Sequence, residues 1–528
     1  MICSRSYRVL EYRYKRAPFK HQKNALRISA RKKNFALFAE MGTGKTKILI
    51  DNAAMLFQAE EIDACVIIAP NGLQQNWLDE IKLNFPNDYF AAYWSKLLRH
   101  GGTGKPLKEW PVGRAFRFFI LNIEALLTDD AYRETLRFIK QRKVLLAVDE
   151  STRIKSPDAD RTRRVMMLGQ YAKYKRIMSG APMPNGPIDI FSQMKFLDPQ
   201  ILGFDSFVAF KSYYCMLVPP THPLVQNIAK KSAAARMRGK SEEQIDALAK
   251  KFAGRLQIME RGTDGQPLYR NLEVLEEKIA PHLYRIRKAD CLDLPPKVYQ
   301  KVFVELSPKQ QKIYDQVRNE IMAEFVIDKQ LHQITSEIAI KRMTRLAQII
   351  CNHFVPDPDY DEDVKPQPQQ IDKISPRITA LEELIEDAGR PPLVIWVRHR
   401  YDIVEISELL KRMKIKHGIL QGKLSIKERT ATIAAFQAGK IGAIIGIAAL
   451  GIGINLQRAD LNIYYSNSFN LEDRLQSEDR SHRAGRQGVV NVIDIIAAST
   501  LDEKIVTALR SKKNIAHAVL RDRIDDWI

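Results

Sequence analysis

The chain has 528 residues, which is more than one hydrophobic core usually organises, so two or more packed domains are expected. Its 83 lysines and arginines outnumber its 62 aspartates and glutamates, and the formal net charge of +21 favours a polyanionic partner, nucleic acid above all. No stretch of about 18 apolar residues is present to span a bilayer, so no membrane partner is expected.

The N-terminal segment and the cysteines predict a location inside a cell. The segment MICSRSYRVLEYRYKRAP has no continuous apolar run and no small-residue cleavage site, so no secretory signal is expected. The five cysteines form no CxxC pair and are too scattered for a zinc site or a disulfide framework. We predict a reducing, cytoplasmic environment.

Apolar strand-like runs alternate with helical stretches over the first two hundred residues, which is typical of a parallel α/β fold. Each predicted strand ends in a small or polar residue, at the position where open α/β sheets bind their ligands. The five predicted strands are FALFAE at 35–40, ACVIIAP at 64–70, FRFFILN at 116–122, KVLLAVDE at 143–150 and KRIMSGAP at 175–182.

The segment AEMGTGKT follows the first of these strands and opens a helical stretch. Its glycines, Gly42 and Gly44, let backbone amides approach phosphate oxygens, which is what a phosphate-binding loop requires. In the same loop, Lys45 adds a positive charge and Thr46 is a ligand for magnesium. The residues predicted to bind ATP here are Glu40, Met41, Gly42, Thr43, Gly44, Lys45 and Thr46.

An acidic pair ends the strand VLLAVDE, about a hundred residues after the phosphate-binding loop. Hydrolysis of a nucleoside triphosphate needs a carboxylate that holds magnesium, and Asp149 is placed for that role. The next residue, Glu150, is predicted to orient or deprotonate the attacking water.

The middle of the chain has a different composition. From about Phe204 to Ala280 and from Ser307 to Cys351, it is rich in Lys, Arg, Glu, Gln and Ala, which predicts helices. The segment from Asp357 to Gln370 combines acidic residues with prolines and is predicted to be an exposed linker. Strand-like runs then return as PLVIWV at 392–397, KHGILQG at 416–422, IGAIIGI at 441–447, DLNIYYS at 460–466 and VVNVIDIIA at 489–497.

A second functional segment is QSEDRSHR, at residues 476–483. Arg480 and Arg483 are spaced by three, so they would share one face of a helix if this segment is helical, and they could neutralise the γ-phosphate as it leaves. We group Gln476 and two glycines of the loop ALGIGINL, Gly451 and Gly453, with the nucleotide as well. Two half-sites so distant in sequence indicate an ATPase assembled between two lobes.

An ordered series of short motifs runs through most of the chain. The first half contains PFKHQ at 18–22, MGTGKT at 41–46, IIAPNGLQQNWLDEI at 67–81, DESTRIK at 149–155 and SGAPMPN at 179–185. The second half contains LYRIRKADCLDLPPK at 283–297, VELSPKQQKIYD at 304–315, GKLSIKERTATIAAF at 422–436, ALGIGINL at 449–456 and QSEDRSHRAGRQG at 476–488. Together they resemble the Swi/Snf-type ATPases of helicase superfamily two.

This resemblance implies an α/β fold of two RecA-like parallel-sheet lobes with helical insertions. Residues 1–200 would form the ATP-binding lobe, 201–283 a helical protrusion, and 284–528 the second lobe, with a protrusion at about 305–370 and a C-terminal brace helix. It also implies that Gln22 reads the adenine, that ATP and Mg²⁺ bind between the lobes, and that the protein tracks along duplex DNA.

Two positions depart from the family pattern. In the motif SGAPMPN, Ala181 stands where the family usually has threonine, which removes a hydroxyl that helps to couple hydrolysis to DNA contacts. Arg486 stands between Gly485 and Gln487, where the family has adjacent glycine and glutamine, so the role of that glutamine is not carried over.

Two basic clusters, at residues 1–33 and at Lys230 to Lys240, could pair with phosphates and add affinity that is independent of base sequence. No base-reading module is evident, so we expect a non-sequence-specific partner, double-stranded or branched DNA. The absence of chromatin-binding or nuclease modules predicts a bare, monomeric engine of a kind that suits a bacterium, archaeon or virus.

Three functions remain open at this stage. The first is an ATP-driven translocase or remodeller on double-stranded DNA, and the second is a strand-separating or branch-migrating helicase on DNA or RNA. The third is an ATP-gated scaffold that binds nucleic acid with little turnover, against which the complete set of hydrolytic residues argues.

Overall fold

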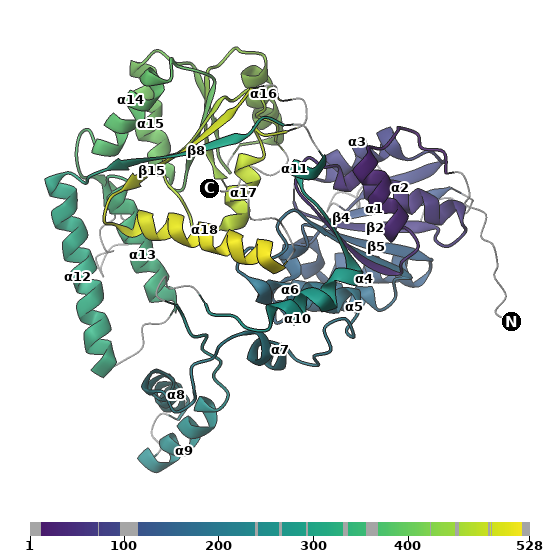
Figure 1. Ribbon diagram of the computed structural model, residues 1–528, viewed down its shortest axis with the longest axis horizontal. Helices are drawn as coiled ribbons and strands as arrows, with labels where there is room; N and C mark the ends of the chain where they lie inside the picture. The colour runs from purple at the N-terminus through teal and green to yellow at the C-terminus, as the bar shows by residue number, and fades with distance from the viewer. Residues whose placement is uncertain are drawn as a thin grey trace. The chain divides into compact units, whose positions relative to one another are not determined.

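The computed structural model describes residues 12–71, 73–94, 115–237, 241–262, 267–291, 294–330, 336–354, 368–422, 424–448, 454–483, 486 and 488–519. The chain divides into two compact units. The first comprises Met1–Phe207, Leu272–Asp293 and Ala516–Ile528, and the second comprises Val208–Asn271 and Leu294–Ile515. Each unit contains one large parallel sheet, which confirms the predicted α/β fold of two RecA-like lobes (Figure 1).

The first unit is built on a seven-stranded sheet with the order β3-β4-β2-β5-β6-β1-β7, in which all neighbouring strands are parallel. The strands are β1 (Asn34–Ala39), β2 (Ala64–Ala69), β3 (Tyr89–Tyr93), β4 (Phe116–Asn122), β5 (Val144–Asp149), β6 (Tyr174–Ser179) and β7 (Leu283–Ile286). Strands β2 and β5 are buried along their whole length, as expected of central strands covered on both faces.

Helices of the first unit surround this sheet. They are α1 (Lys20–Ser29), α2 (Lys45–Gln58), α3 (Gln74–Asn84), α4 (Asp129–Lys140), α5 (Asp160–Gly169), α6 (Ile190–Leu197), α10 (Leu272–Ile279) and α11 (Lys288–Cys291). A fully buried arginine, Arg176 on β6, fastens two of them to the sheet. Its guanidinium donates to Asn52 of α2 and to the carbonyl of Ser29 at the end of α1.

The second unit is built on a six-stranded parallel sheet with the order β12-β13-β11-β14-β15-β8. Its strands are β8 (Lys297–Val304), β11 (Leu393–Val397), β12 (His417–Leu420), β13 (Ala443–Ile447), β14 (Leu461–Tyr464) and β15 (Val490–Ala497). Alternate residues of β11 enter two different cores: Ile395 packs with α14 and α15 residues, whereas Trp396 packs with Phe436 of α16. The sheet is therefore covered on both faces.

The second unit also contains the helices α7 (Phe207–Tyr214), α8 (Pro223–Arg236), α9 (Glu242–Ala253), α12 (Pro308–Gln330), α13 (Ser336–Ile350), α14 (Pro376–Asp387), α15 (Arg400–Arg412), α16 (Ile426–Gln437), α17 (Leu471–Glu478) and α18 (Leu501–Val519). A short antiparallel pair, β9 (His353–Phe354) and β10 (Gln369–Gln370), follows α13. Across the described part of both units, the structure holds no helix of the length and apolarity that crossing a bilayer requires.

All ten predicted strands are present, but β3, β7 and β8 were not predicted. These three strands lie at sheet edges, β3 and β7 at the two ends of the first sheet and β8 at one end of the second. An edge strand is not covered as a central strand is, and β8 exposes four of its eight residues. Edge strands are therefore harder to recognise in a sequence than central parallel strands, although β12, the other edge strand of the second sheet, was predicted.

The chain returns to the first sheet after the helical insertion. Strand β7 pairs with β1, so a lobe boundary at residue 284 falls inside a strand of the first unit. In the insertion predicted at 201–283, α8 and α9 belong to the second unit and α10 to the first. Most of the predicted linker, residues 357–367, lies outside the described residues.

A buried polar pair lies beside the second sheet. Asp402, on α15, is fully buried, and its Oδ1 lies 3.6 Å from Nε2 of His353. The other carboxyl oxygen accepts hydrogen bonds from the Ser466 hydroxyl (2.7 Å) and the His399 amide (3.3 Å). Burial raises the pKa of Asp402 to about 7, although these two hydrogen bonds act to lower it. Burial also lowers the pKa of His353 to about 4.

We predict that Asp402→Asn stabilises the protein, and more at pH 8 than at pH 5. The pKa of Asp402 is raised on folding from 3.8, so its contribution to stability is lost progressively from about pH 4 to pH 7. Asparagine has no such loss, keeps one oxygen for Ser466 and can donate from its amide to His353. Thermal unfolding midpoints at the two pH values measure the effect. Glu408→Gln, which changes an exposed carboxylate of the same helix, is the control; an equal gain from Asp402→Asn at both pH values would contradict the prediction.

Candidate nucleotide site

The phosphate-binding loop joins β1, which ends at Ala39, to α2, which begins at Lys45. Gly42 has a φ of 84° and Gly44 a φ of 86°, in the left-handed region that favours glycine. Space is limited as well, because a Cβ on Gly44 would lie 2.1 Å from Nε2 of Gln22. The loop therefore requires glycine, and it directs the amides at the start of α2 toward a ligand.

Two side chains at the start of α2 keep their polar groups open. The Lys45 Nζ lies 3.8 Å from Oε1 of Glu150 and makes no hydrogen bond within the described residues. The Thr46 hydroxyl also lacks a hydrogen-bond partner in that part of the chain. Since buried or half-buried polar groups are normally satisfied, these two side chains are available for a ligand.

The acidic pair lies at the carboxyl end of β5. Asp149 accepts hydrogen bonds from the Trp77 indole (3.2 Å) and from the Glu150 amide (3.1 Å). Burial and then the adjacent Glu150 raise the pKa of Asp149 to about 7, although Lys45 opposes them. Glu150 has a φ of 49°, in the left-handed region that is uncommon for a residue with a side chain.

The loop after β6 adds a hydroxyl to this arrangement. Ser179 Oγ donates to Oε2 of Glu150 at 3.4 Å and accepts from the Ala181 amide at 3.2 Å. Ala181 itself has no hydroxyl, so in this chain the hydroxyl next to Glu150 comes from Ser179, two residues earlier. Gly180 lies between them, and a Cβ built there would be 3.6 Å from Lys45 Nζ.

Gln22 supports the loop from α1. Its Oε1 accepts from the Phe19 amide (3.0 Å), and its Nε2 donates to the carbonyl of Thr43 (3.1 Å). His21 Nε2 lies 2.8 Å from the same carbonyl. Gln22 is thus tied to the backbone of the phosphate-binding loop, and its contact with adenine stays a prediction.

Two residues near this site were not predicted to take part. Trp77 lies in the motif IIAPNGLQQNWLDEI and holds Asp149, and Arg285 lies in LYRIRK and contacts Glu40. The only signal in the sequence was membership of these motifs, because neither residue type nor spacing shows which strand end a side chain reaches.

The second predicted half of the site follows α17, which ends at Glu478. The shared helical face predicted for Arg480 and Arg483 is wrong, because the helix does not continue to them. The Ser481 hydroxyl donates to the carbonyl of Glu478 (3.2 Å), and the carbonyl of Arg480 accepts from Leu456 (3.0 Å). The Glu478 carbonyl also accepts from the His482 amide (3.4 Å), so one helical hydrogen bond persists beyond Glu478, but the Arg480 carbonyl pairs with another segment.

Arg483 is half-buried, and its guanidinium makes few polar contacts with the described residues. Its Nε donates to the carbonyl of Asp479 (3.1 Å), and within the described residues no carboxylate lies within ion-pair distance of it. Burial lowers the pKa of Arg483, and Asp479 offsets this only in part. Arg480, three residues earlier in the chain, is buried. The predicted residue Gln476 donates a hydrogen bond to Glu472 (3.1 Å). The predicted glycines Gly451 and Gly453 lie outside the described residues.

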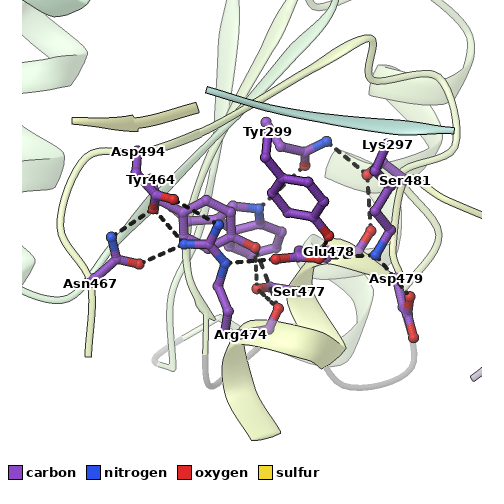
Figure 2. Close-up of polar contacts among 12 residues, drawn as sticks. Lys297, Tyr299, Tyr464, Asn467, Arg474, Ser477, Glu478, Asp479, Ser481 and Asp494 are labelled. Atoms are coloured by element: carbon purple, nitrogen blue, oxygen red, sulfur yellow. Dashed lines mark hydrogen bonds and ion pairs between the residues drawn. The ribbon is translucent and has the colours of Figure 1, made fainter. Parts of the chain in front are cut away.

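A buried ion network holds α17 against the second sheet, and Figure 2 shows its members. Arg474 donates to Asp494 of β15 (2.5 and 3.1 Å) and to Glu478 (2.8 Å), and its guanidinium lies 3.4 Å from the centre of the Tyr464 ring. From β8, Lys297 donates to Glu478 at 2.9 Å. The network fixes the end of the helix from which the segment with Arg480 and Arg483 begins.

Arg486, the residue inserted in the last motif, has a structural role. Its guanidinium pairs with Asp460 and donates to the carbonyls of Gln457 (2.6 Å) and Gly488 (2.8 Å). The inserted arginine therefore links the segment between α17 and β15 to the segment before β14 by an ion pair and a hydrogen bond.

We predict that Arg474→Ala destabilises the protein by about 3–5 kcal/mol, because it leaves Asp494 and Glu478 buried without their cation. Denaturant unfolding measures this loss. Arg412→Ala is the matched control, since Arg412 pairs with Glu382 at 3.6 Å on an exposed surface and is expected to cost about 0.5 kcal/mol. A similar loss in the two variants would show that the network is not required for folding.

The described site residues thus form two sets, each within one unit. Lys45, Asp149, Glu150 and the phosphate-binding loop belong to the first unit, and Arg480 and Arg483 belong to the second. The first set follows the carboxyl ends of β1 and β5, where parallel sheets bind ligands, whereas the second set follows α17 and precedes β15.

Comparison with known proteins identifies the class. Residues 21–355 match the SNF2-related domain, and residues 376–485 match the helicase conserved C-terminal domain. The chain therefore belongs to the SNF2-related family, and its domains are those of an ATP-hydrolysing enzyme of helicase superfamily two.

Individual relatives are distant. The chain is 22% identical over 493 residues to an uncharacterized ATP-dependent helicase of Mycoplasma genitalium, covering 92% of this chain and 40% of that protein. It is 24% identical over 498 residues to TATA-binding protein-associated factor 172 of Homo sapiens, covering 86% of this chain and 24% of that protein. The chain thus spans less than half the length of either relative.

Among solved structures, the chain is similar to the Sulfolobus solfataricus SWI2/SNF2 ATPase core in complex with dsDNA. The sequence identity is 22%, the TM-score is 0.40, and the match covers 99% of this chain and 96% of that one.

Proposed function

We propose that this chain couples ATP hydrolysis to movement along double-stranded DNA, with its two units as the two halves of one motor. The observation that carries the proposal is the contrast between open and satisfied polar groups. Lys45 and Thr46 in the first unit have no hydrogen-bond partner among described residues, and Arg483 has only one backbone carbonyl. Arg474, by comparison, is bonded to two carboxylates.

The open groups match the needs of phosphoryl transfer. Lys45 would contact the β- and γ-phosphate oxygens above the amides of the loop, and Glu150 would orient and deprotonate the attacking water. Arg483 would neutralise the charge that develops on the transferred group, which makes hydrolysis depend on both units.

A magnesium ion fits the donors of the first unit. The Thr46 hydroxyl has no hydrogen-bond partner in the described part of the chain, and Asp149 is a buried carboxyl whose charge would be stabilised by a cation. Hydroxyl and carboxylate oxygens are ligands that Mg²⁺ prefers, with water and phosphate completing its shell. When bound, the ion supplies positive charge to the phosphates.

The charge distribution supports a nucleic-acid partner. On α9, the side chains of Lys250, Lys251 and Arg255 are exposed at or just after the end of the helix, and on α8 Lys230 is half-exposed and paired with Asp246 at 3.1 Å. Such a surface binds phosphates without reading bases. Branched DNA as a preferred form, a monomeric state and a cytoplasmic location also remain proposals.

We predict that duplex DNA stimulates ATP turnover more than single strands or RNA do, and that the protein displaces a triplex-forming strand without opening a fork. Turnover and displacement are measured on matched substrates, with Glu150→Gln as the inactive control that retains the fold. Higher salt should weaken the stimulation because the DNA contacts are electrostatic.

Other outcomes would favour the alternatives. Fork opening without triplex displacement would indicate a strand-separating helicase; the Mycoplasma genitalium relative is named an ATP-dependent helicase. Stronger stimulation by RNA would indicate an RNA substrate. Binding of duplex DNA with no turnover in the wild type would leave an ATP-gated scaffold.

A further inference from the structure

The phosphate-binding loop has a charged contact besides that of Lys45 with Glu150. It is made by Arg285 of edge strand β7. In the register of the sheet, Arg285 lies opposite Phe38 of β1, which in turn lies opposite Ser179 of β6. Its side chain crosses β1: Nη1 donates to the carbonyl of Gly180 at 3.1 Å and to that of Phe38 at 3.4 Å. One guanidinium therefore joins the carboxyl ends of three adjacent strands.

The same guanidinium reaches the first residue of the loop. Nη2 of Arg285 lies 3.4 Å from Oε1 of Glu40, and the Arg285 side chain is only 13% exposed. The other carboxylate oxygen of Glu40 accepts the Lys288 amide at 3.0 Å, and the Glu40 amide donates to the carbonyl of Ile286 at 2.9 Å. The segment 285–288 thus contacts both carboxylate oxygens and the backbone amide of Glu40.

The two anchor points of Arg285, which are Glu40 and the carbonyl of Gly180, lie next to the groups that would face phosphate. Glu40 precedes Met41 and Gly42, and Lys288 Cε lies 3.7 Å from the position of a Cβ on Gly42. A Cβ on Gly180 would lie 3.5 Å from the Met41 amide and 3.6 Å from Lys45 Nζ. A shift of either anchor would therefore move the loop or the ammonium beside it.

We propose that Arg285 is a positioning residue for ATP hydrolysis, which holds Glu40 and Gly180 so that the loop amides and Lys45 face the phosphates. This inference rests on the proposed function of the loop. Glu40 acts as the acceptor through which Arg285 and the Lys288 amide set the loop, in addition to its predicted place in the nucleotide site. The charge of the pair matters because a neutral residue at either position would keep fewer or weaker hydrogen bonds.

The test compares two arginines of one segment by steady-state ATP kinetics with duplex DNA. Arg285→Ala should lower kcat/KM for ATP by roughly ten- to a hundredfold, since small misplacements of reacting groups have effects of this size. Arg287→Ala is the control, because Arg287, which precedes α11, pairs with Asp290 of that helix (2.6 Å), and its kinetics should be those of the wild type. Thermal unfolding is measured first, so that only folded variants are compared.

Further variants separate positioning from stability. Arg285→Lys should recover part of kcat/KM, and Glu40→Gln combined with Arg285→Ala should be no worse than Arg285→Ala alone, because the two residues act as one unit. If Arg285→Ala does not fold, Arg285→Lys and Glu40→Gln carry the test through the same kinetic readout. Wild-type kinetics in folded Arg285 variants, or additive losses, would overturn the inference. An inactive wild type would instead overturn the proposed function.

Discussion

The parallel pairing β5-β6-β1-β7 is the constraint on which the nucleotide site depends. Neighbouring parallel strands end at the same edge of a sheet, so segments from residues 39 to 288 meet there although they are far apart in the chain. Lys45 follows β1, Glu150 follows β5, Gly180 follows β6 and Arg285 lies on β7. The contact between Lys45 and Glu150, at 3.8 Å, exists only because β6 alone separates their two strands.

In the second unit, Arg474 and Arg483 differ in their partners: Arg474 is paired with carboxylates, and Arg483 is available to bind a phosphate. Arg474 is enclosed by Asp494, Glu478 and the Tyr464 ring, as Figure 2 shows. Arg483 lies nine residues later, and its side chain has one backbone acceptor among the residues that the structure describes. An arginine held by carboxylates stabilises the fold, whereas a desolvated arginine without them gains most from a phosphate. The network around Arg474 thus fixes the helix end from which the available arginine is presented.

Much of this arrangement could be predicted from the sequence because its signals are local. The glycines of the phosphate-binding loop, the acid pair Asp149 and Glu150, and the central strands each occupy one short segment with its own pattern. Edge strands such as β8 lack that pattern, since they are not covered on both faces. After α17 ends at Glu478, the Arg480 carbonyl accepts from Leu456 of another segment, a contact that no helical spacing indicates.

Charge partners were the least predictable part. The sequence shows that Arg285 lies in a motif, but only the strand order shows that it reaches Glu40 and the carbonyl of Gly180. Likewise, the burial of Asp402 beside His353 depends on where β9 lies against α15. Such pairs arise from tertiary packing, which spacing along the chain does not encode.

The central claim is that the two units complete one ATPase, and Arg483→Ala tests it most directly. ATP binding is measured by equilibrium titration and hydrolysis by single turnover with duplex DNA, with Arg483→Lys as the charge-retaining comparison. We expect hydrolysis to fall by about a thousandfold or more, as on removal of an arginine that stabilises the transferred phosphoryl group, while the Kd for ATP changes little. Equal losses in binding and hydrolysis, or normal hydrolysis, would contradict the account.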